Sequence, residues 1–317
     1  MLLIDNGTND PFFNLASEEY FFRHKKENII ILYVNSPSII VGKHQNCLEE
    51  INLEFVVKNK LPVIRRISGG GTVYHDEGNL NFTFITNSEE GKQVDFRKFI
   101  EPVNLFLRGR GVTVEVGDKN EIRSGGLKFS GNAEHVFRNR VMHHGTILFS
   151  SDLHKLGAAL KRGDAVFVSR SVHSNRTNVG NLEGVVKGIK TTEQLKEEFF
   201  NFLEIYYENT ARQNPGKNDI EEINKLAGEK YKTWGWNFAY GPAYEMSNSF
   251  TVGSEKCNVW LKVEKGVIQD CRIDGCEGKD VLEKALTGAS HSYLELNRIL
   301  KNRITGIDEK NIFRFFG

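Results

Sequence analysis

The segment from Arg65 to Asp76 reads RRISGGGTVYHD and holds the residues best suited to bind a phosphate or a carboxylate. Three consecutive glycines are costly to order, so a fold that keeps them needs a reason, such as a backbone that approaches a ligand closely. Such a loop can present backbone N–H groups to phosphate oxygens, and Arg66 adds a planar guanidinium. A plain hairpin turn with a surface arginine is the alternative. The segment is not a Walker A motif, because no Gly-Lys-Ser/Thr follows it.

A second candidate is Lys128, in a stretch that reads GLKFSGNA from residue 126 to residue 133. In an extended strand Leu127 and Phe129 face one side, whereas Lys128 and Ser130 face the other. A lysine that shares a face with a serine, just before a glycine, can hold an anion inside a cleft. A lysine on a solvated strand face is the alternative.

Two further polar segments offer less specific chemistry. His143 and His144 are adjacent on a predicted strand, so their side chains point to opposite faces and do not easily bind one metal ion. We therefore interpret both histidines as structural. The polar run at 169–179 is predicted to be a loop.

Hydrophobic patterning predicts both helices and strands around these segments. Amphipathic helices are expected at 14–25, 48–60, 96–108 and 194–207, and strands at 29–34, 38–41, 63–65, 80–86, 112–116 and 143–149. Glycines at 125, 126 and 131 indicate tight turns between further strands. The mixture predicts an α+β architecture without fixing its topology.

A change of texture near residue 234 indicates a second, smaller unit. The stretch WGWNF is followed by Gly241-Pro242, which we interpret as a linker. A small β-meander is expected after it, with strands at 259–263, 266–268 and 271–273 and helices at 281–285 and 293–300. The predicted domains are 1–246 and 247–317.

Composition narrows the classes of function and the compartment. The 317 residues carry 42 basic and 41 acidic side chains and a net charge of +1, which provides no basic field for nucleic acid. The N-terminus lacks the pattern of a signal peptide, and no apolar run approaches the roughly 20 residues that span a bilayer. A cytoplasmic protein that binds neither nucleic acid nor membrane is expected.

The four cysteines are Cys47, Cys257, Cys271 and Cys276. They form no CxxC motif, so a structural zinc site is not expected. Cys271 and Cys276 are close in sequence, but we interpret all four as free thiols in a reducing compartment.

Taken together and in this order, the segments resemble the lipoate-protein ligase A family. The matching stretches are RRISGGGTVYHD at 65–76, GNLNFT at 78–83, KFSGNA at 128–133, HHGT at 143–146, the loop at 171–178 and WGWN at 234–237. The resemblance extends from about Asn6 into the small C-terminal unit. It implies a biotin/lipoate ligase-type catalytic domain, with mixed β-sheets flanked by helices, and a small α+β accessory domain that rotates between half reactions.

The resemblance also implies residue roles. Lys128 is the catalytic lysine that contacts the lipoyl carboxylate and the α-phosphate, and Arg66 contacts phosphate. The remaining implied binding positions are Gly71, Thr72, Val73 and Tyr74 for the nucleotide, Ala133 at the edge of the adenylate site, and Gly69 and Gly70 beside the lipoyl chain. The family often has Asn-Asp where this chain has Asn120-Glu121, so Glu121 is the expected metal ligand.

The implied activity uses ATP and Mg²⁺ to convert lipoate into lipoyl-AMP, and then transfers the lipoyl group to a lysine. The implied acceptors are lipoyl domains of 2-oxoacid dehydrogenase E2 subunits and the glycine cleavage H protein. One alternative is an ATP-independent lipoyl or octanoyl transferase of the same fold, which would need a cysteine nucleophile; Cys47 is the cysteine nearest the motifs. A non-catalytic binder of lipoate or nucleotide is another. A biotin ligase is disfavoured because the chain has no Gly-Arg-Gly-Arg stretch.

Overall fold

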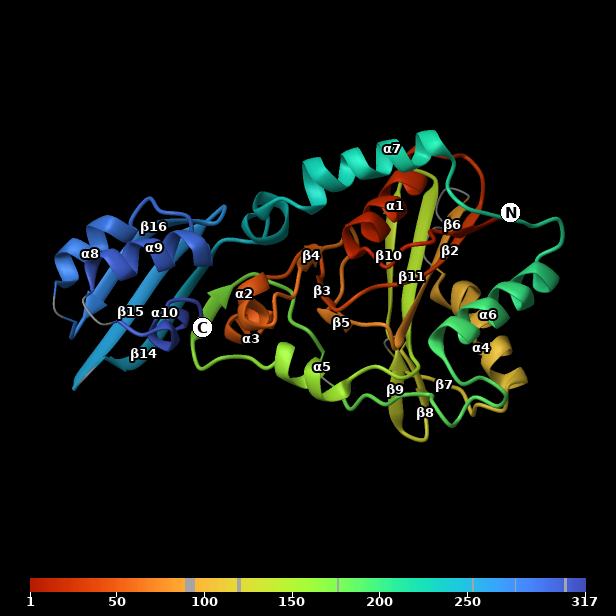
Figure 1. The fold of residues 1–317 in the computed structure, drawn as a ribbon, viewed down its shortest axis with the longest axis horizontal. Coiled ribbons are helices and arrows are strands. Elements are labelled where there is room, and N and C mark those ends of the chain that lie inside the picture. Colours follow the sequence, from red (N-terminus) through yellow and green to blue (C-terminus); the bar gives the residue numbers. More distant parts are fainter. Residues whose placement is uncertain (89–94, 119–120, 176, 253, 277, 305–306) are drawn as a thin grey trace.

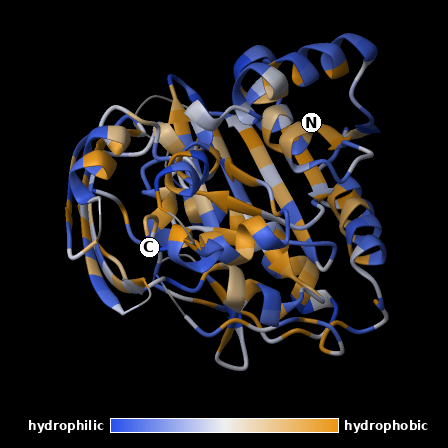
Figure 2. Cartoon of the chain, turned by 60° about the vertical axis from the view of Figure 1, so that its left-hand side comes forward, coloured by the Kyte–Doolittle hydropathy of each residue, from blue (hydrophilic) through white to orange (hydrophobic). Residues whose placement is uncertain are grey.

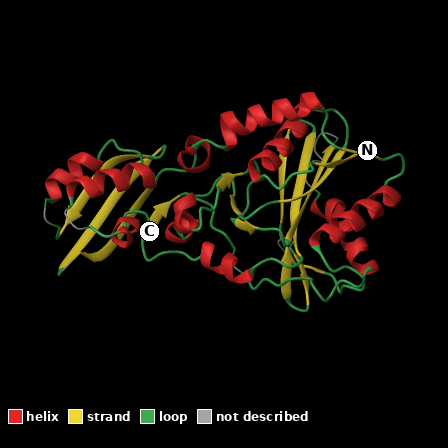
Figure 3. Cartoon of the chain, viewed as in Figure 1, coloured by secondary structure: helices red, strands yellow, loops and turns green. Residues whose placement is uncertain are grey.

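The structure is a computed structural model that describes residues 1–88, 95–118, 121–175, 177–252, 254–276, 278–304 and 307–317. Helices and sheets are intermixed along the chain, which confirms the predicted α+β class (Figure 3). The sheet made by the C-terminal strands lies at one end of the elongated molecule, and the largest sheet lies towards the other end (Figure 1).

The largest sheet has six strands in the order β10-β11-β6-β2-β1-β13. Strand β1 is parallel to β2 and to β13, whereas the other pairs are antiparallel. Its strands are β1 (Leu2–Asp5), β2 (Ile29–Val34), β6 (Asn79–Asn87), β10 (Asn132–Phe137), β11 (Arg140–Leu148) and β13 (Ala211–Gln213).

Helices cover both faces of this sheet, and the alternation along β2 shows how. Ile30 and Leu32 pack into one apolar cluster, whereas Ile29 and Ile31 pack into another. The first cluster includes side chains of α4 (Phe96–Gly109) and α6 (Thr192–Tyr206), and the second includes side chains of α1 (Pro11–His24) and α7 (Lys217–Leu226). Coloured by hydropathy, central strands are largely hydrophobic and α7 is mostly hydrophilic (Figure 2). A strand buried on both faces explains the unbroken apolar run IIILYV.

Two three-stranded sheets carry the predicted functional segments. One has the order β4-β3-β5 and the other the order β7-β8-β9. Their strands are β3 (Ser38–Val41), β4 (Val63–Arg65), β5 (Val73–His75), β7 (Glu115–Val116), β8 (Ile122–Ser124) and β9 (Leu127–Ser130), and the short helix α5 (Leu153–Ala159) packs nearby.

The single helix predicted at 48–60 is wrong. The segment forms two short helices, α2 (Cys47–Glu50) and α3 (Leu53–Lys58). The side chain of Asn46 accepts a hydrogen bond from Leu48 N and caps α2, and Asn52 accepts one from Phe55 N and caps α3. An asparagine that caps a new helix interrupts the one before it.

The C-terminal part forms a four-stranded sheet in the order β12-β14-β15-β16. Its elements are β12 (Val166–Ser169), β14 (Tyr244–Val252), β15 (Glu255–Glu264), β16 (Val267–Asp274), α8 (Lys279–Leu286), α9 (Tyr293–Arg303) and α10 (Glu309–Phe313). The expected meander is present, although the two pieces at 266–268 and 271–273 are one strand. Strand β12 comes from the preceding part of the chain, and the boundary predicted at 246/247 falls inside β14. The division into domains stays a prediction.

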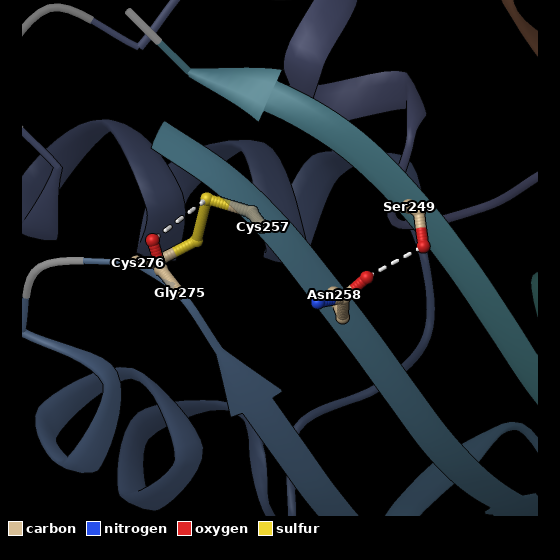
Figure 4. Close-up of a disulfide and its surroundings, with 5 residues drawn as sticks. All are labelled: Ser249, Cys257, Asn258, Gly275 and Cys276. Atoms are coloured by element: carbon tan, nitrogen blue, oxygen red, sulfur yellow. Dashed lines mark hydrogen bonds between the residues drawn. A yellow bond between two sulfur atoms is a disulfide. The ribbon is translucent and has the colours of Figure 1, made fainter. Parts of the chain in front are cut away.

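A disulfide joins Cys257 of β15 to Cys276, which follows β16 (Figure 4). The prediction of four free thiols is therefore wrong for this pair, whereas Cys47 and Cys271 are free and buried. Antiparallel pairing places Asn258 opposite Asp274, which brings the two cysteines to a Cα–Cα distance of 5.2 Å. That register is invisible in the sequence. No helix among the described residues is long and apolar enough to cross a membrane.

Candidate active site

Two adjoining cavities, of about 260 and about 250 Å³, lie between the glycine-rich segment, β9 and β11. The first has mainly apolar walls, made by Val73, Phe129, Leu148, Leu156 and Leu160, with Tyr74, Asn79, Ser130 and Glu50 as further lining residues. The second is lined by several polar side chains. Both are lined by Thr72, Val73, Lys128, Gly131, Thr146, Ser174, Asn175 and Thr177, so Lys128 lies where the two cavities meet.

Arg66 stabilises the conformation of the glycine loop through hydrogen bonds to its residues. Its Nη2 donates to the carbonyl oxygens of Gly69 and Gly71 at 2.6 and 2.8 Å, and its Nε donates to Ser68 Oγ at 3.0 Å. Gly70 adopts a φ of +85°, which favours glycine. Arg66 also lines the second cavity, so its cationic face borders the space where a carboxylate or phosphate would bind.

Arg65 is fully buried and connects residues 42–45 to the WGWN segment through hydrogen bonds. Its Nη1 donates to three carbonyl oxygens of residues 42–45 at 2.8 to 3.1 Å. Its Nε and Nη2 donate to the carbonyls of Trp236 and Asn237 at 3.1 and 3.0 Å. The two consecutive arginines therefore have separate structural tasks, which the sequence alone did not reveal.

Lys128 is half-buried on β9, and the backbone of the 178–180 segment holds it there. Lys128 N donates to Asn178 O, and Lys128 O accepts from Gly180 N, both at 3.0 Å. A Cβ on Gly131 would lie 3.2 Å from Lys128 Nζ, so the glycine leaves room for the ammonium group. Burial lowers the pKa of Lys128, an effect that the nearby Glu121 carboxylate opposes. The side chain thus places a desolvated cation between the cavities.

The polar loop that begins at Ser171 folds over the glycine loop. Ser174 Oγ accepts hydrogen bonds from Thr72 N at 2.8 Å and from Gln45 Nε2 at 3.1 Å. A Cβ on Gly71 would lie 3.0 Å from this same Oγ, so the close approach depends on glycine. Arg176 lies outside the described residues. This loop, with Asn175 and Thr177, covers both cavities.

A buried carboxylate, Glu18 of α1, is hydrogen-bonded to Tyr33 and His144, which line the second cavity, and was missed by the sequence interpretation. Its oxygens accept hydrogen bonds from Tyr33 Oη at 2.8 Å, from Thr83 Oγ1 and from His144 Nδ1 at 3.0 Å. Burial opposes ionisation of Glu18, but His144, Thr83 and Tyr33 outweigh it and lower its pKa. His144 therefore belongs to the cavity wall, whereas His143 stacks on Phe99 in the apolar core.

A hydrogen bond of 2.6 Å joins His144 Nε2 to Ser68 Oγ, which completes a serine–histidine–glutamate chain. Ser68 is fully buried and is not among the lining residues of either cavity within the described chain. The serine is therefore not presented to a ligand as a nucleophile. The chain fixes the orientation of the His144 ring.

The remaining predicted residues lie around the same cavities. Val73 and Tyr74 line the first cavity, and burial raises the pKa of the Tyr74 hydroxyl to about 12. Gly70, Gly71 and Ala133 line the second, and Thr72 and Val73 line both. Gly69 is not among the lining residues of either cavity in the described part of the chain, although its carbonyl binds Arg66.

A family model described as the lipoyl protein ligase A/B catalytic domain matches residues 10–204, which include every predicted binding residue. The chain belongs to the lipoyl protein ligase family. The resemblance seen in the sequence and the expected catalytic fold are thereby confirmed.

Curated relatives match this ligase chain over nearly its whole length. Lipoate-protein ligase LplJ of Bacillus subtilis is 39% identical over 284 residues, which cover 87% of this chain and 85% of the relative. Lipoate-protein ligase 1 of Staphylococcus aureus is 35% identical over 320 residues, which cover 99% and 95%. The chain is therefore an enzyme of the lipoate-protein ligase type.

Solved structures of ligases share the fold over about three quarters of this chain. A putative lipoate protein ligase of Thermoplasma acidophilum with bound lipoic acid has a TM-score of 0.63 and 26% identity, with coverage of 75% of this chain and 98% of that chain. A bipartite archaeal ligase from the same organism, analysed with its E2 lipoyl domain, has a TM-score of 0.63 and 25% identity, with coverage of 75% and 95%. A lipoate-protein ligase A bound with ATP has the same TM-score and 25% identity, with coverage of 75% and 97%.

The four cysteines are poorly placed to act as the nucleophile that the transferase alternative needs. Burial raises the pKa values of Cys47 and Cys271 to about 12, which disfavours the nucleophilic thiolate. Cys257 and Cys276 form the disulfide. No cysteine of the described chain lines either cavity.

The predicted metal ligand, Glu121, lines the second cavity beside Lys128. Its Oε1 accepts hydrogen bonds from Arg123 Nη2 and Nε at 3.0 and 3.2 Å. Across the described residues, no three His, Cys, Asp or Glu side chains come together as a metal site. A single carboxylate fits Mg²⁺ that reaches the protein with nucleotide phosphates, because that ion keeps most of its ligands from water and phosphate.

Proposed function

We propose that this ligase binds ATP in the first cavity and lipoate in the second, with Lys128 between the two reacting groups. The position of Lys128 at the meeting point of the cavities carries the proposal. Lipoic acid and ATP in related solved structures support the choice of substrates. Of the two cavities, Tyr74 lines only the first and Gly70 only the second, as these assignments require. Gly71 and Ala133, which were expected beside the nucleotide, line the second cavity.

In the first half reaction, a carboxylate oxygen of lipoate attacks the α-phosphorus of ATP. The new P–O bond forms lipoyl-AMP, and the bond to the leaving pyrophosphate breaks. Lys128 brings two anionic groups together and stabilises the charge of the transition state, which is worth most in a site that excludes water. Arg66 adds positive potential, and its hydrogen bond to the Gly71 carbonyl holds the backbone of Gly71 and Thr72 in position.

In the second half reaction, the neutral amine of an acceptor lysine attacks the lipoyl carbonyl carbon. AMP leaves with the electron pair of the C–O bond, and the amine loses a proton. Proximity alone supplies much of this acceleration, because the mixed anhydride is already activated. No covalent enzyme intermediate is needed, in agreement with the buried thiols.

Mg²⁺ would neutralise charge on the triphosphate, and Glu121 is the residue we propose to hold it. Glu121 lines the second cavity, so the phosphates would have to reach it past Lys128, whose charge it affects. The proposed acceptors are lipoyl domains of 2-oxoacid dehydrogenase E2 subunits and the glycine cleavage H protein. A related archaeal ligase studied with its E2 lipoyl domain supports the first of these. The cytoplasmic location stays a prediction.

The test is lipoate-dependent exchange of labelled pyrophosphate into ATP. Wild type should catalyse exchange with Mg²⁺ present, and Lys128→Ala should reduce it by about 10²-fold or more. Lys155→Ala is the control, because that side chain is 54% exposed on α5 and belongs to neither cavity.

Two results would overturn parts of the proposal. Absence of exchange from folded wild type would remove the adenylation step and favour a carrier-to-carrier transferase or a non-catalytic binder. Undiminished exchange by Lys128→Ala would remove the assigned role of that lysine only.

A further inference from the structure

The loop that begins at Ser171, which we call the covering loop, is attached to other elements at both of its ends. At one end β12 pairs with β14 of the C-terminal sheet, and at the other the backbone of residues 178–180 is hydrogen-bonded to Lys128. Three residues of the loop line both cavities. The contacts that hold its middle therefore decide how firmly a ligand is enclosed.

The side chain of Gln45 holds the middle of this loop with an amide group whose atoms are all used. Its Oε1 accepts hydrogen bonds from Gly42 N at 3.0 Å and from Thr72 Oγ1 at 2.9 Å. Its Nε2 donates to the Val172 carbonyl and to Ser174 Oγ, both at 3.1 Å. Gln45 is fully buried and is not among the lining residues of either cavity in the described chain. Its amide therefore joins the glycine loop to the covering loop from outside the cavities.

Two backbone partners fix the orientation of this amide. Gly42 N–H can only donate, so the Gln45 atom that faces it is the oxygen, and the Val172 carbonyl can only accept, so the atom that faces it is the nitrogen. The amide cannot be turned round without losing both hydrogen bonds. Its oxygen thus serves the glycine loop, and its nitrogen serves the covering loop.

Helix α2, which follows Gln45 closely, adds two carboxylates to the same attachment. Ser171 Oγ donates to Glu49 Oε2 at 2.9 Å, and Ser174 N donates to Glu50 Oε1 at 3.2 Å. Glu49 is 9% exposed and Glu50 is 2% exposed, so water competes little for these hydrogen bonds. The short stretch from Gln45 to Glu50 therefore attaches the covering loop at several points.

We propose that Gln45 is a positioning residue that keeps the covering loop closed over the acyl-adenylate until an acceptor lysine arrives. This inference rests on the proposed function, in which lipoyl-AMP occupies both cavities between the two half reactions. Water that reaches the lipoyl carbonyl carbon breaks the C–O bond to AMP and releases lipoate and AMP, a side reaction that a closed site prevents. Gln45 thus acts on retention of the intermediate, whereas Lys128 acts on its formation.

Gln45→Glu separates the two halves of the amide. The carboxylate keeps an oxygen for Gly42 N and Thr72 Oγ1, but it removes the donor to Ser174 and places a second oxygen against the Val172 carbonyl. Loss of this buried donor should favour the open loop by about tenfold.

The measurement is the decay of protein-bound adenylate. The protein is loaded with lipoate, Mg²⁺ and ATP labelled at the α-phosphate, excess substrate is removed by rapid gel filtration, and the bound label is followed over time. In Gln45→Glu the rate constant for loss of label should rise about tenfold, while the initial amount of bound label stays within about twofold of wild type. Equal rate constants would overturn the inference.

Asn248→Asp is the matched control, because it exchanges an amide for a carboxylate at another buried site. Asn248 is 7% exposed, and its Nδ2 donates to the Arg314 carbonyl at 2.9 Å in the C-terminal part. A variant that is only destabilised should form less adenylate but lose it at the wild-type rate. A rate constant raised equally in the control would overturn the role of Gln45.

Gln45→Met serves if Gln45→Glu does not fold. Methionine has nearly the same length and buries no charge, yet it removes both donated hydrogen bonds. Its rate constant for loss of label should also rise about tenfold. Retention at the wild-type rate in this variant would overturn the inference.

Hydrogen exchange separates failure of this inference from failure of the proposed function. Val172 N donates to the His44 carbonyl and Ser174 N donates to Glu50, so exchange of these amides reports opening of the loop whether or not an adenylate forms. Wild type that retains no label would contradict the proposed function, yet Gln45→Glu should still speed this exchange about tenfold. Equal exchange in the two proteins would overturn the inference by itself.

Discussion

The part of the chain before Tyr244, which bears the cavities, and the C-terminal part both have apolar cores, but they differ in what else they bury. The C-terminal part, from Tyr244 onward, buries only Asn248 and His291 among polar side chains of the described residues. The cavity-bearing part buries many more, including Glu18, Arg65 and Arg66. Buried charge is costly unless paired, so its concentration in one region marks where function constrains the sequence.

The largest expected effect comes from breaking the charge network of the cavity-bearing part. Glu18→Ala leaves His144 and the hydroxyls of Tyr33 and Thr83 without their shared acceptor. The free energy of unfolding should fall by about 3–5 kcal/mol, measured by urea denaturation. Glu54→Ala is the control, because its pair with Lys58 is exposed and should contribute little. A similar loss in both variants would remove the distinction between buried and exposed charge.

The next effect concerns the region that lacks such a network. The disulfide of the C-terminal part closes a sequence separation of 19 residues, so Cys276→Ser should lower the stability of the oxidised protein by about 3 kcal/mol. The loss should appear in the C-terminal amides by hydrogen exchange while pyrophosphate exchange persists. A loss in the amides of α1 instead would mean that the two regions unfold as one unit.

Acid should destabilise the cavity-bearing part more than the C-terminal sheet. Burial lowers the pKa of His75 and His143 to about 3 and of His135 to about 4, whereas the C-terminal part contributes only His291, at about 4. In the unfolded chain these histidines have a pKa of about 6.5. As the pH falls below that value, they are protonated in the unfolded state before they are protonated in the folded state. The free energy of unfolding should therefore decrease as pH falls below 6.5, by about 1.4 kcal/mol per pH unit for each group.

One carboxyl group acts in the opposite direction. Burial raises the pKa of Glu134 to about 7, so its stabilising contribution is present in acid and is lost as pH rises from about 4.5 towards 7. Between about pH 4.5 and 6.5, the change that Glu134 causes in the free energy of unfolding cancels the opposite change caused by one histidine. Urea denaturation at pH 6.5 and pH 5.0 measures the balance, and His143→Gln should make the dependence shallower. A flat profile would contradict the buried, neutral histidines.

The smallest effect separates the two cavities. Leu156 lines the first cavity from α5, and Leu15 lines the second from α1. Each Leu→Val change removes one methylene, worth about 0.8 kcal/mol or about fourfold. Leu156→Val should raise KM for ATP alone, and Leu15→Val should raise KM for lipoate alone. Steady-state kinetics would reverse the cavity assignment if the two effects were exchanged.

The sequence predicted elements best where the signal is local. Strands β2, β3 and β4 were predicted with the bounds observed, because each is rich in β-branched residues and starts directly after an Asn or a Pro. The pairing of β12 with β14 and the Cys257–Cys276 contact were missed, because both depend on register between distant segments. The break between α2 and α3 was a local signal, the capping asparagines, that was not used.

The same distinction applies to the site. Lys128 and the glycine loop stood out by residue type, and their assigned roles stay predictions that the experiments above test. Glu18, His75 and Tyr33 were missed as site residues because three separate elements bring them together. One signal was available: Glu18 and Glu19 are adjacent acids within a helix whose neighbours are mostly apolar, which is unusual unless both are paired.

The membership of β12 in the C-terminal sheet has a mechanical consequence. Strand β12 ends at Ser169, and the loop that covers both cavities begins two residues later. The covering loop is therefore attached at one end to the sheet through the ladder between β12 and β14. If the C-terminal sheet rotates during the reaction cycle, as the family resemblance implies, the loop must follow it or the ladder must break. Opening of the covering loop to substrates and rotation of the C-terminal sheet would then be coupled motions.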